Sequence, residues 1–316
     1  MELNVPSKKY IMKKFLLFFL TLPLILFLNS CEDVVDLDLK EDGAQLVVDA
    51  WINNKAEPQV IKLRRTIPYF DNSFAPEVTG ATVIVADSDS TLFVFEDSDE
   101  DGDYVWTPQP GQQLGVEGKE YALYIELDGD EYISLSEAKR EPLVDSIGYE
   151  FRDDLIGVAD GIIAQIYARD QVGTGDAYWI KTYKNGAFLN KAQEMNLTYD
   201  AAFGPGGNSD GILFIPPIRT GINRLPDTGD DAIDTDSFPP YEIGDNIRVE
   251  IHSLTQEAFF YLFQIREQMT QADNGLFATP ITNVPSNIIP QTADAKEDPV
   301  GFFCVSLVSE IERDVE

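Results

Sequence analysis

The chain has 316 residues, of which 23 are basic and 55 are acidic, so its formal net charge at neutral pH is −32. An acidic excess of this size repels nucleic acid and anionic membrane surfaces, and both are therefore excluded as partners of the folded part of the chain. Apolar residues make up 44% of the sequence, which is enough to build hydrophobic cores.

The N-terminal segment has the pattern of a bacterial lipoprotein signal. Two lysines precede an apolar run over residues 15–28, which is as long as the apolar region of a signal peptide and shorter than the ~20 residues that span a bilayer. The run ends in Leu-Asn-Ser before Cys31. We predict that residues 1–30 are a signal peptide and that the Cys31 thiol takes a diacylglycerol and becomes the mature N-terminus. A plain secretory signal and a membrane-spanning anchor are the alternatives.

The segment after Cys31 turns acidic at once and reads CEDVVDLDL. We expect residues 31–44 to be a lipidated tether. Cleavage before Cys31 would remove four of the basic residues and one of the acidic ones, which leaves 19 basic and 54 acidic residues in 286. A mature chain of this length favours two domains.

Residues 45–141 show the pattern of an immunoglobulin-like β-sandwich. Short alternating segments rich in β-forming residues follow one another with turn residues between them, as in a sandwich of antiparallel sheets. The expected strands are 45–52, 59–67, 81–87, 90–97, 103–108, 120–128 and 130–138.

Residues 142–316 predict a second β-rich domain with one substantial helix. Strands are expected at 142–154, 161–170, 176–186 and 247–254. Residues 199–246 are dense in Gly, Pro and Asp and form a long loop, where a binding surface is often found. The helix is expected at residues 255–272, with a core-facing stripe of Phe259, Leu262, Phe263 and Met269.

An acidic hairpin tip is the strongest candidate for a metal site. Asp97, Asp99, Asp101 and Asp103, with Gly102 among them, have the spacing that begins an EF-hand loop and could hold Ca²⁺ weakly. The twelfth position is Pro108, where a bidentate Glu is required, and no flanking helices are expected. A solvated acidic turn is the alternative interpretation. The cluster at residues 230–236 has weaker spacing and the same ambiguity.

Catalytic chemistry has few candidate residues. His252 is the one imidazole in the chain, and the alternation of its strand places it on the face opposite Ile251, which we expect to be exposed. Cys304 lies among apolar residues and is expected in a buried strand. Nucleophile, base and oxyanion donor cannot be assembled from the sequence, so no enzyme is predicted. Trp106 is the best exposed aromatic candidate for stacking on a sugar, since Trp51 and Trp179 lie within apolar strands.

Several stretches resemble a family of lipoproteins from Bacteroidota, the domain of unknown function four-two-four-nine. They are CEDVVDLDL, LVVDAWI, VIKLRRTIPYFDNSFAPEVTGATVIVAD, LVDSIGYEF, ITNVPSNI and VGFFCVSLVSE, and they span nearly the whole mature chain. The resemblance implies an immunoglobulin-like sandwich and a second β-rich domain on the outer membrane, encoded beside TonB-dependent receptors. It implies no active site.

The expected function is that of a non-enzymatic, lipid-anchored outer-membrane protein that assists a TonB-dependent receptor. Acidic residues just after Cys31 are typical of a surface-export signal, and we expect the chain to face the cell exterior. The alternative is a surface module that captures a glycan or peptide, with Ca²⁺ as a weak aid. No other cofactor is expected.

Overall fold

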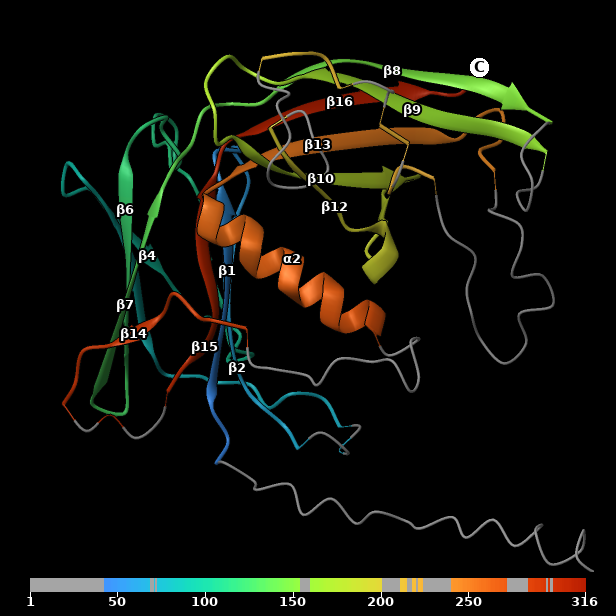
Figure 1. Ribbon diagram of the computed structural model, residues 1–316. Coiled ribbons are helices and arrows are strands. Elements are labelled where there is room, and N and C mark those ends of the chain that lie inside the picture. The colour runs from blue at the N-terminus through green and yellow to red at the C-terminus, as the bar shows by residue number, and fades with distance from the viewer. Residues whose placement is uncertain are drawn as a thin grey trace, which may run out of the picture. The chain divides into compact units, whose positions relative to one another are not determined.

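The computed structural model describes residues 43–316, apart from residues 69–70, 72, 154–159, 201–210, 215–217, 220, 224–239, 272–283, 294 and 296–297. The described part is mainly β, as predicted, and its one α-helix is α2 (Gln256–Gln271), close to the expected 255–272 (Figure 1). Cys31, residues 31–42 of the expected tether and the 230–236 acidic cluster lie outside the described residues.

A first β-sandwich is built from two facing sheets. The sheet of four strands has the order β15-β1-β2-β5, and the sheet of five has the order β14-β7-β6-β3-β4. The strands are β1 (Leu46–Asn53), β2 (Gln59–Arg65), β3 (Thr82–Asp87), β4 (Leu92–Phe95), β5 (Asp103–Trp106), β6 (Glu120–Leu127), β7 (Asp130–Glu137), β14 (Ile289–Pro290) and β15 (Val300–Ser306). Inward side chains of both sheets form one buried core, and the seven strands expected in residues 45–141 all occur.

Two strands from the far end of the chain complete this sandwich, which the alternation pattern did not predict. β15 pairs with β1 in parallel, from Val47↔Val300 to Asn53↔Ser306, and β14 pairs with β7. The parallel pair is tight at Gly301, whose φ is +111°, and a Cβ there would lie 2.0 Å from the Val48 carbonyl oxygen. Only glycine fits this position, since it tolerates both the dihedral and the approach.

A second hydrophobic core lies between another five-stranded sheet, which we call the second sheet, and a hairpin stacked on it (Figure 1). The sheet has the order β11-β10-β13-β16, with β12 also paired to β10. Its strands are β10 (Ala177–Lys184), β11 (Ala187–Phe188), β12 (Asn196–Tyr199), β13 (Asn246–Leu254) and β16 (Val308–Asp314), and the hairpin is β8 (Leu143–Arg152) with β9 (Gly161–Arg169). The four strands expected in this half occur as β8, β9, β10 and β13.

The chain passes from the first sandwich to the second sheet through one residue. β15 ends at Ser306 and β16 begins at Val308, so Leu307 alone separates a strand of one sheet from a strand of another. The Leu307 amide donates to the Ser253 hydroxyl at 2.9 Å, and the Ser253 amide donates to the Leu307 carbonyl at 2.9 Å. These reciprocal bonds hold the crossing against β13.

Helix α2 fills the corner between β15 and the second sheet (Figure 1). It begins after Thr255, whose hydroxyl accepts from the Ala258 amide at 3.1 Å as an N-cap does. Phe259 and Leu262 are buried, as predicted. Met269 is 54% exposed, so its expected place in the core stripe is wrong.

The long segment at 199–246 is described only in part. Leu213 and Ile218 of this segment form isolated bridges with β9, Arg169↔Leu213 and Ile166↔Ile218, and Ile218 is fully buried. The described pieces of this loop therefore lie along the edge of β9 that does not pair with β8. No helix of the described residues is long and apolar enough to cross a membrane.

Candidate functional site

The five-stranded sheet of the first sandwich, β14-β7-β6-β3-β4, carries on its outer face an apolar surface that we call the belt. Outward positions of an exposed sheet are usually polar, because only the inward positions meet the core. Here two neighbouring cross-strand rows are apolar, with Ala86, Leu92, Ala122 and Leu135 in one and Ile84, Val94, Tyr124, Ile133 and Ile289 in the other. No described helix or strand covers this face (Figure 1).

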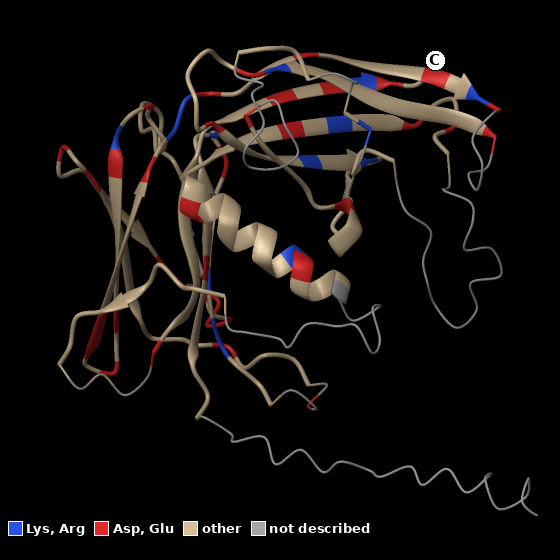
Figure 2. Cartoon of the chain, in the orientation of Figure 1, with Lys and Arg blue, Asp and Glu red and all other residues tan. Residues whose placement is uncertain are grey.

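Four of the nine belt side chains are exposed, the other five are half-buried, and charged residues border the belt. Leu135 is 67% exposed, Leu92 61%, Ile289 58% and Val94 48%. The cross-strand pairs on either side of the two rows are Glu120↔Glu137 and Glu126↔Glu131. Figure 2 shows the middles of β6 and β7 free of charged residues and their ends marked by them. A contiguous apolar surface with a charged rim is typical of a protein contact site.

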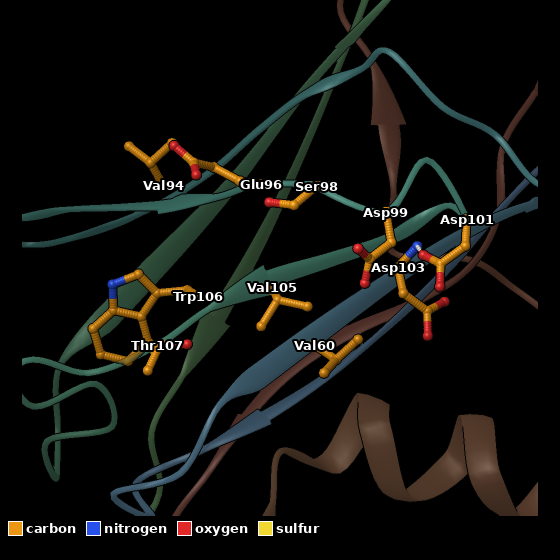
Figure 3. A pocket seen from close by; sticks show the side chains of 10 residues that line it. All are labelled: Val60, Val94, Glu96, Ser98, Asp99, Asp101, Asp103, Val105, Trp106 and Thr107. Atoms are coloured by element: carbon orange, nitrogen blue, oxygen red, sulfur yellow. Dashed lines mark hydrogen bonds between the residues drawn. The ribbon is translucent and has the colours of Figure 1, made fainter.

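An open hollow of about 660 Å³ adjoins the belt where β4 meets β5. Val60, Val94, Val105 and Trp106 supply its apolar lining, and Glu96, Asp99, Asp101 and Asp103 supply carboxylates. Figure 3 shows the three aspartates gathered at one end and Trp106 at the other. Trp106 is only 8% exposed and packs edge-on against Phe93 at 5.1 Å, so the expectation of an exposed stacking platform is wrong.

The carboxylates predicted to bind Ca²⁺, from Asp97 to Asp103, do not surround one common point. The Asp97 carboxylate accepts from the Asp101 and Gly102 amides, each at 3.1 Å, which makes it a cap of the turn. Asp103 pairs with Arg64 and lies 3.4 Å from Lys62. Within the described ranges, no group of three or more acidic, His or Cys side chains is placed to hold a metal ion.

His252 is the largest departure from the sequence interpretation. It was expected at the surface, but it is 4% exposed, because β13 is covered on this face by β15 and the β1–β2 turn. Its Nε2 lies 3.1 Å from Glu250 Oε2, and its Nδ1 lies 3.2 Å from Ser306 Oγ. A carboxylate only accepts, so Nε2 carries the proton and Nδ1 accepts from the serine hydroxyl.

The charge of this buried cluster resides on Glu250. Burial would raise its pKa, but hydrogen bonds from His252 and Lys55 hold the pKa well below its usual range. Lys55 Nζ donates to it at 2.8 Å, and Arg248 is a further ion-pair partner. Burial, with the nearby Lys181 charge, lowers the pKa of His252 to about 4, so the ring is neutral at physiological pH.

Ser306, His252 and Glu250 therefore form a buried chain of hydroxyl, imidazole and carboxylate, the groups used by serine hydrolases. Ser306 is 5% exposed and also lies 3.4 Å from the Ile52 carbonyl oxygen. A nucleophilic serine must face a space that admits a substrate, and this one is enclosed between β1 and β13. The cluster ties the first sandwich to the second sheet.

A family model described as Domain of unknown function (DUF4249) matches residues 32–312. The chain belongs to this family. The match confirms the family resemblance inferred from the sequence, and it covers the belt, the hollow and the buried cluster. A comparison with curated proteins finds no match.

The described cysteine of this DUF4249 protein is structural in character. Cys304 is 1% exposed within β15, as the apolar flanks predicted, and burial raises the pKa of its thiol to about 12. A thiol held protonated in this way is a poor nucleophile. Trp51 and Trp179 were expected in the core. Both are half-buried and pack against the hydrophobic cluster that contains Phe259 and Leu262 of α2, and their rings meet edge-on with centroids 5.6 Å apart.

Proposed function

We propose that this DUF4249 protein is a non-enzymatic accessory protein, anchored in the outer membrane through the Cys31 lipid and exposed at the cell surface. It acts by binding a protein partner, a TonB-dependent receptor. The observation that carries the proposal is the belt, because a chain of net charge −32 that keeps two apolar rows exposed has a reason other than solubility to present them.

The chemistry of the fold supports a binding role. The one imidazole is buried and neutral, and the serine beside it is enclosed. Neither group is placed to attack a substrate, which agrees with a protein that makes contacts and forms no covalent intermediate.

The partner test is purification of the full-length, tagged chain from outer membranes in a mild detergent. A β-barrel receptor should co-purify in stoichiometric amount and should be lost when the belt is made polar by Leu92→Asn with Leu135→Asn. Ala56→Asn, at an exposed turn away from the belt, is the control. A chain that elutes alone under all detergent conditions would contradict the proposal.

The anchor has its own test. Cys31→Ala should abolish incorporation of labelled fatty acid and release the protein from the membrane fraction, because only acylation is credited with anchoring. Retention of the variant in membranes after a salt wash would refute lipid anchoring while leaving partner binding open.

Ligand capture is the second candidate function, and the hollow favours it. Its volume lies in the range of small-ligand sites, and its lining is mainly polar, with four carboxylates, Ser98 and Thr107 beside four apolar residues. A screen of glycans and short peptides against the purified chain tests this role. A ligand that raises the thermal midpoint of the wild type, but not that of Val60→Asn, would locate binding in the hollow, because Val60 lines the hollow and is not part of the belt.

A further inference from the structure

We infer that the belt and the hollow form one docking surface for a protein segment that presents apolar side chains bordered by Lys or Arg. This inference rests on the proposed function, because it specifies the chemistry of the partner that the belt receives. It does not depend on the identity of that partner.

Continuity of the two features is the first argument. Val94 belongs to the belt and also lines the hollow. A β-bridge between Glu96 and Val105 joins β4 to β5, and Val105 pairs with Val60 on β2. The apolar outer surface of one sheet therefore continues around the corner of the sandwich onto the other sheet, and a single segment can lie across both.

Charge is the second argument. The belt lies between rows that contain Glu120 and Glu126, and the hollow adds further carboxylates beyond Val94. Four basic residues lie near these carboxylates: Lys119 pairs with Asp87 and Asp89, Lys139 with Glu137 of the border, and Lys62 and Arg64 with Asp103 of the hollow. Carboxylates still outnumber these cations, since Glu120, Glu126, Glu131, Glu96, Asp99 and Asp101 come in addition, so the border is acidic on balance and basic side chains on the partner complement it.

The same charges select against the other occupants of an apolar face. A second copy stacked on the belt would bring one acidic border against another in a chain of net charge −32. An anionic lipid surface would meet the same repulsion. A protein segment with apolar and basic side chains can pack against the apolar rows and pair with the carboxylates of their border.

The test is site-specific photocrosslinking in the full-length chain, in the cells that make it. A benzoylphenylalanine residue is placed at Leu135 or Ile289 in the belt, and at Val172 as the control, which is 80% exposed and lies between β9 and β10. We expect Leu135 and Ile289 to crosslink to one protein, through a segment that contains Lys or Arg near the crosslinked residue, and Val172 to give no such product.

A charge variant tests the border separately. Glu96→Gln with Asp99→Asn removes two carboxylates of the hollow without changing side-chain size, and the matched control is Glu242→Gln with Glu257→Gln, two exposed acids outside the surface. The hollow variant should reduce the Leu135 crosslink several-fold, and the reduction should shrink at high salt, since screening weakens exposed charge pairs.

Three outcomes would overturn the inference: crosslinks between two copies of the chain, equal yields at Val172 and Leu135, or a yield that the hollow variant leaves unchanged. If the receptor still co-purifies while the belt positions fail to crosslink, the docking surface is wrong and the proposed function stands. If the receptor also fails to co-purify, both fail.

Discussion

Replacement of His252 by glutamine should change how stability depends on pH. The folded pKa of His252 is about 4, against an ordinary value of 6.5, because the ring is buried and lies near Lys181. At a pH below the ordinary pKa, the His252 imidazole therefore binds a proton in the unfolded chain and stays unprotonated in the folded chain. The free energy of unfolding falls as pH falls from about 6.5 towards about 4, and the stabilisation is complete above this window.

The magnitude follows from the two pKa values. Between about pH 7.5 and about pH 5, protonation of the unfolded imidazole removes about 2 kcal/mol of stability, and the folded ring offsets almost none of it. The lower limit is chosen because Glu250 has an ordinary pKa of 4.5 and a lower one in the fold, so it stays ionised in both states above that limit. His252 is the one histidine in the chain, so no other imidazole titrates there.

The assay is urea unfolding of the wild type and of His252→Gln at matched ionic strength across this pH range. The glutamine amide can still donate to Glu250 but does not titrate, so the stability difference between the two proteins should shift by about 2 kcal/mol in favour of the variant at the acid end. Ser306→Ala, which keeps the ring, should retain the wild-type pH dependence. A stability difference that stays constant with pH would refute the assignment of a buried, neutral ring.

The other predictions concern single features. Gly301→Ala should destabilise the fold by roughly 3 kcal/mol or more in urea unfolding, because its Cβ meets the Val48 carbonyl, and a cost as small as that at the open Gly80 would contradict the parallel pairing. Asp97→Ala should cost about 1–2 kcal/mol through two lost backbone hydrogen bonds, whereas Asp99→Ala, the exposed control, should cost little. A few millimolar Ca²⁺ should leave the thermal midpoint unchanged at matched ionic strength, and a rise that Asp99→Asn removes would restore the metal site. Cys304 should resist maleimide until the chain is unfolded, and labelling of the folded protein at neutral pH would contradict its burial.

The local pattern was sufficient to predict strands but not their partners. β6 alternates in burial and occurs as expected, since alternation in a short window reports which residues of one strand face a core. The pairing of β15 with β1 joins residues about 250 positions apart, and no local pattern encodes it. The expected domain boundary at residue 141 divides the sequence at the end of β7, whereas the first sandwich draws its last strands from beyond residue 288.

The same limit explains the two misplaced candidates. His252 was assigned from the alternation of its strand, which identifies opposite faces but does not say which of them a distant segment covers. Trp106 was chosen because the other two tryptophans lie within apolar strands, a comparison that does not say which way its own side chain faces. In β13 both faces are covered, so the polar face holds His252 and Glu250 in an interior network. In β5 the face with Trp106 turns inward against Phe93.

The belt could have been found from the sequence, because its signal is a departure from alternation. In Thr82–Asp87 and Leu92–Phe95 the inward and outward positions are both apolar, which normally indicates a strand buried on two sides. The fold then leaves the outward side of these strands uncovered by any described element, and β4 lies at the edge of its sheet. A strand with the composition of an interior strand and the position of an edge strand is the feature on which the proposed docking surface rests. Under that proposal, the acidic border favours a basic partner, which would contact it without charge repulsion.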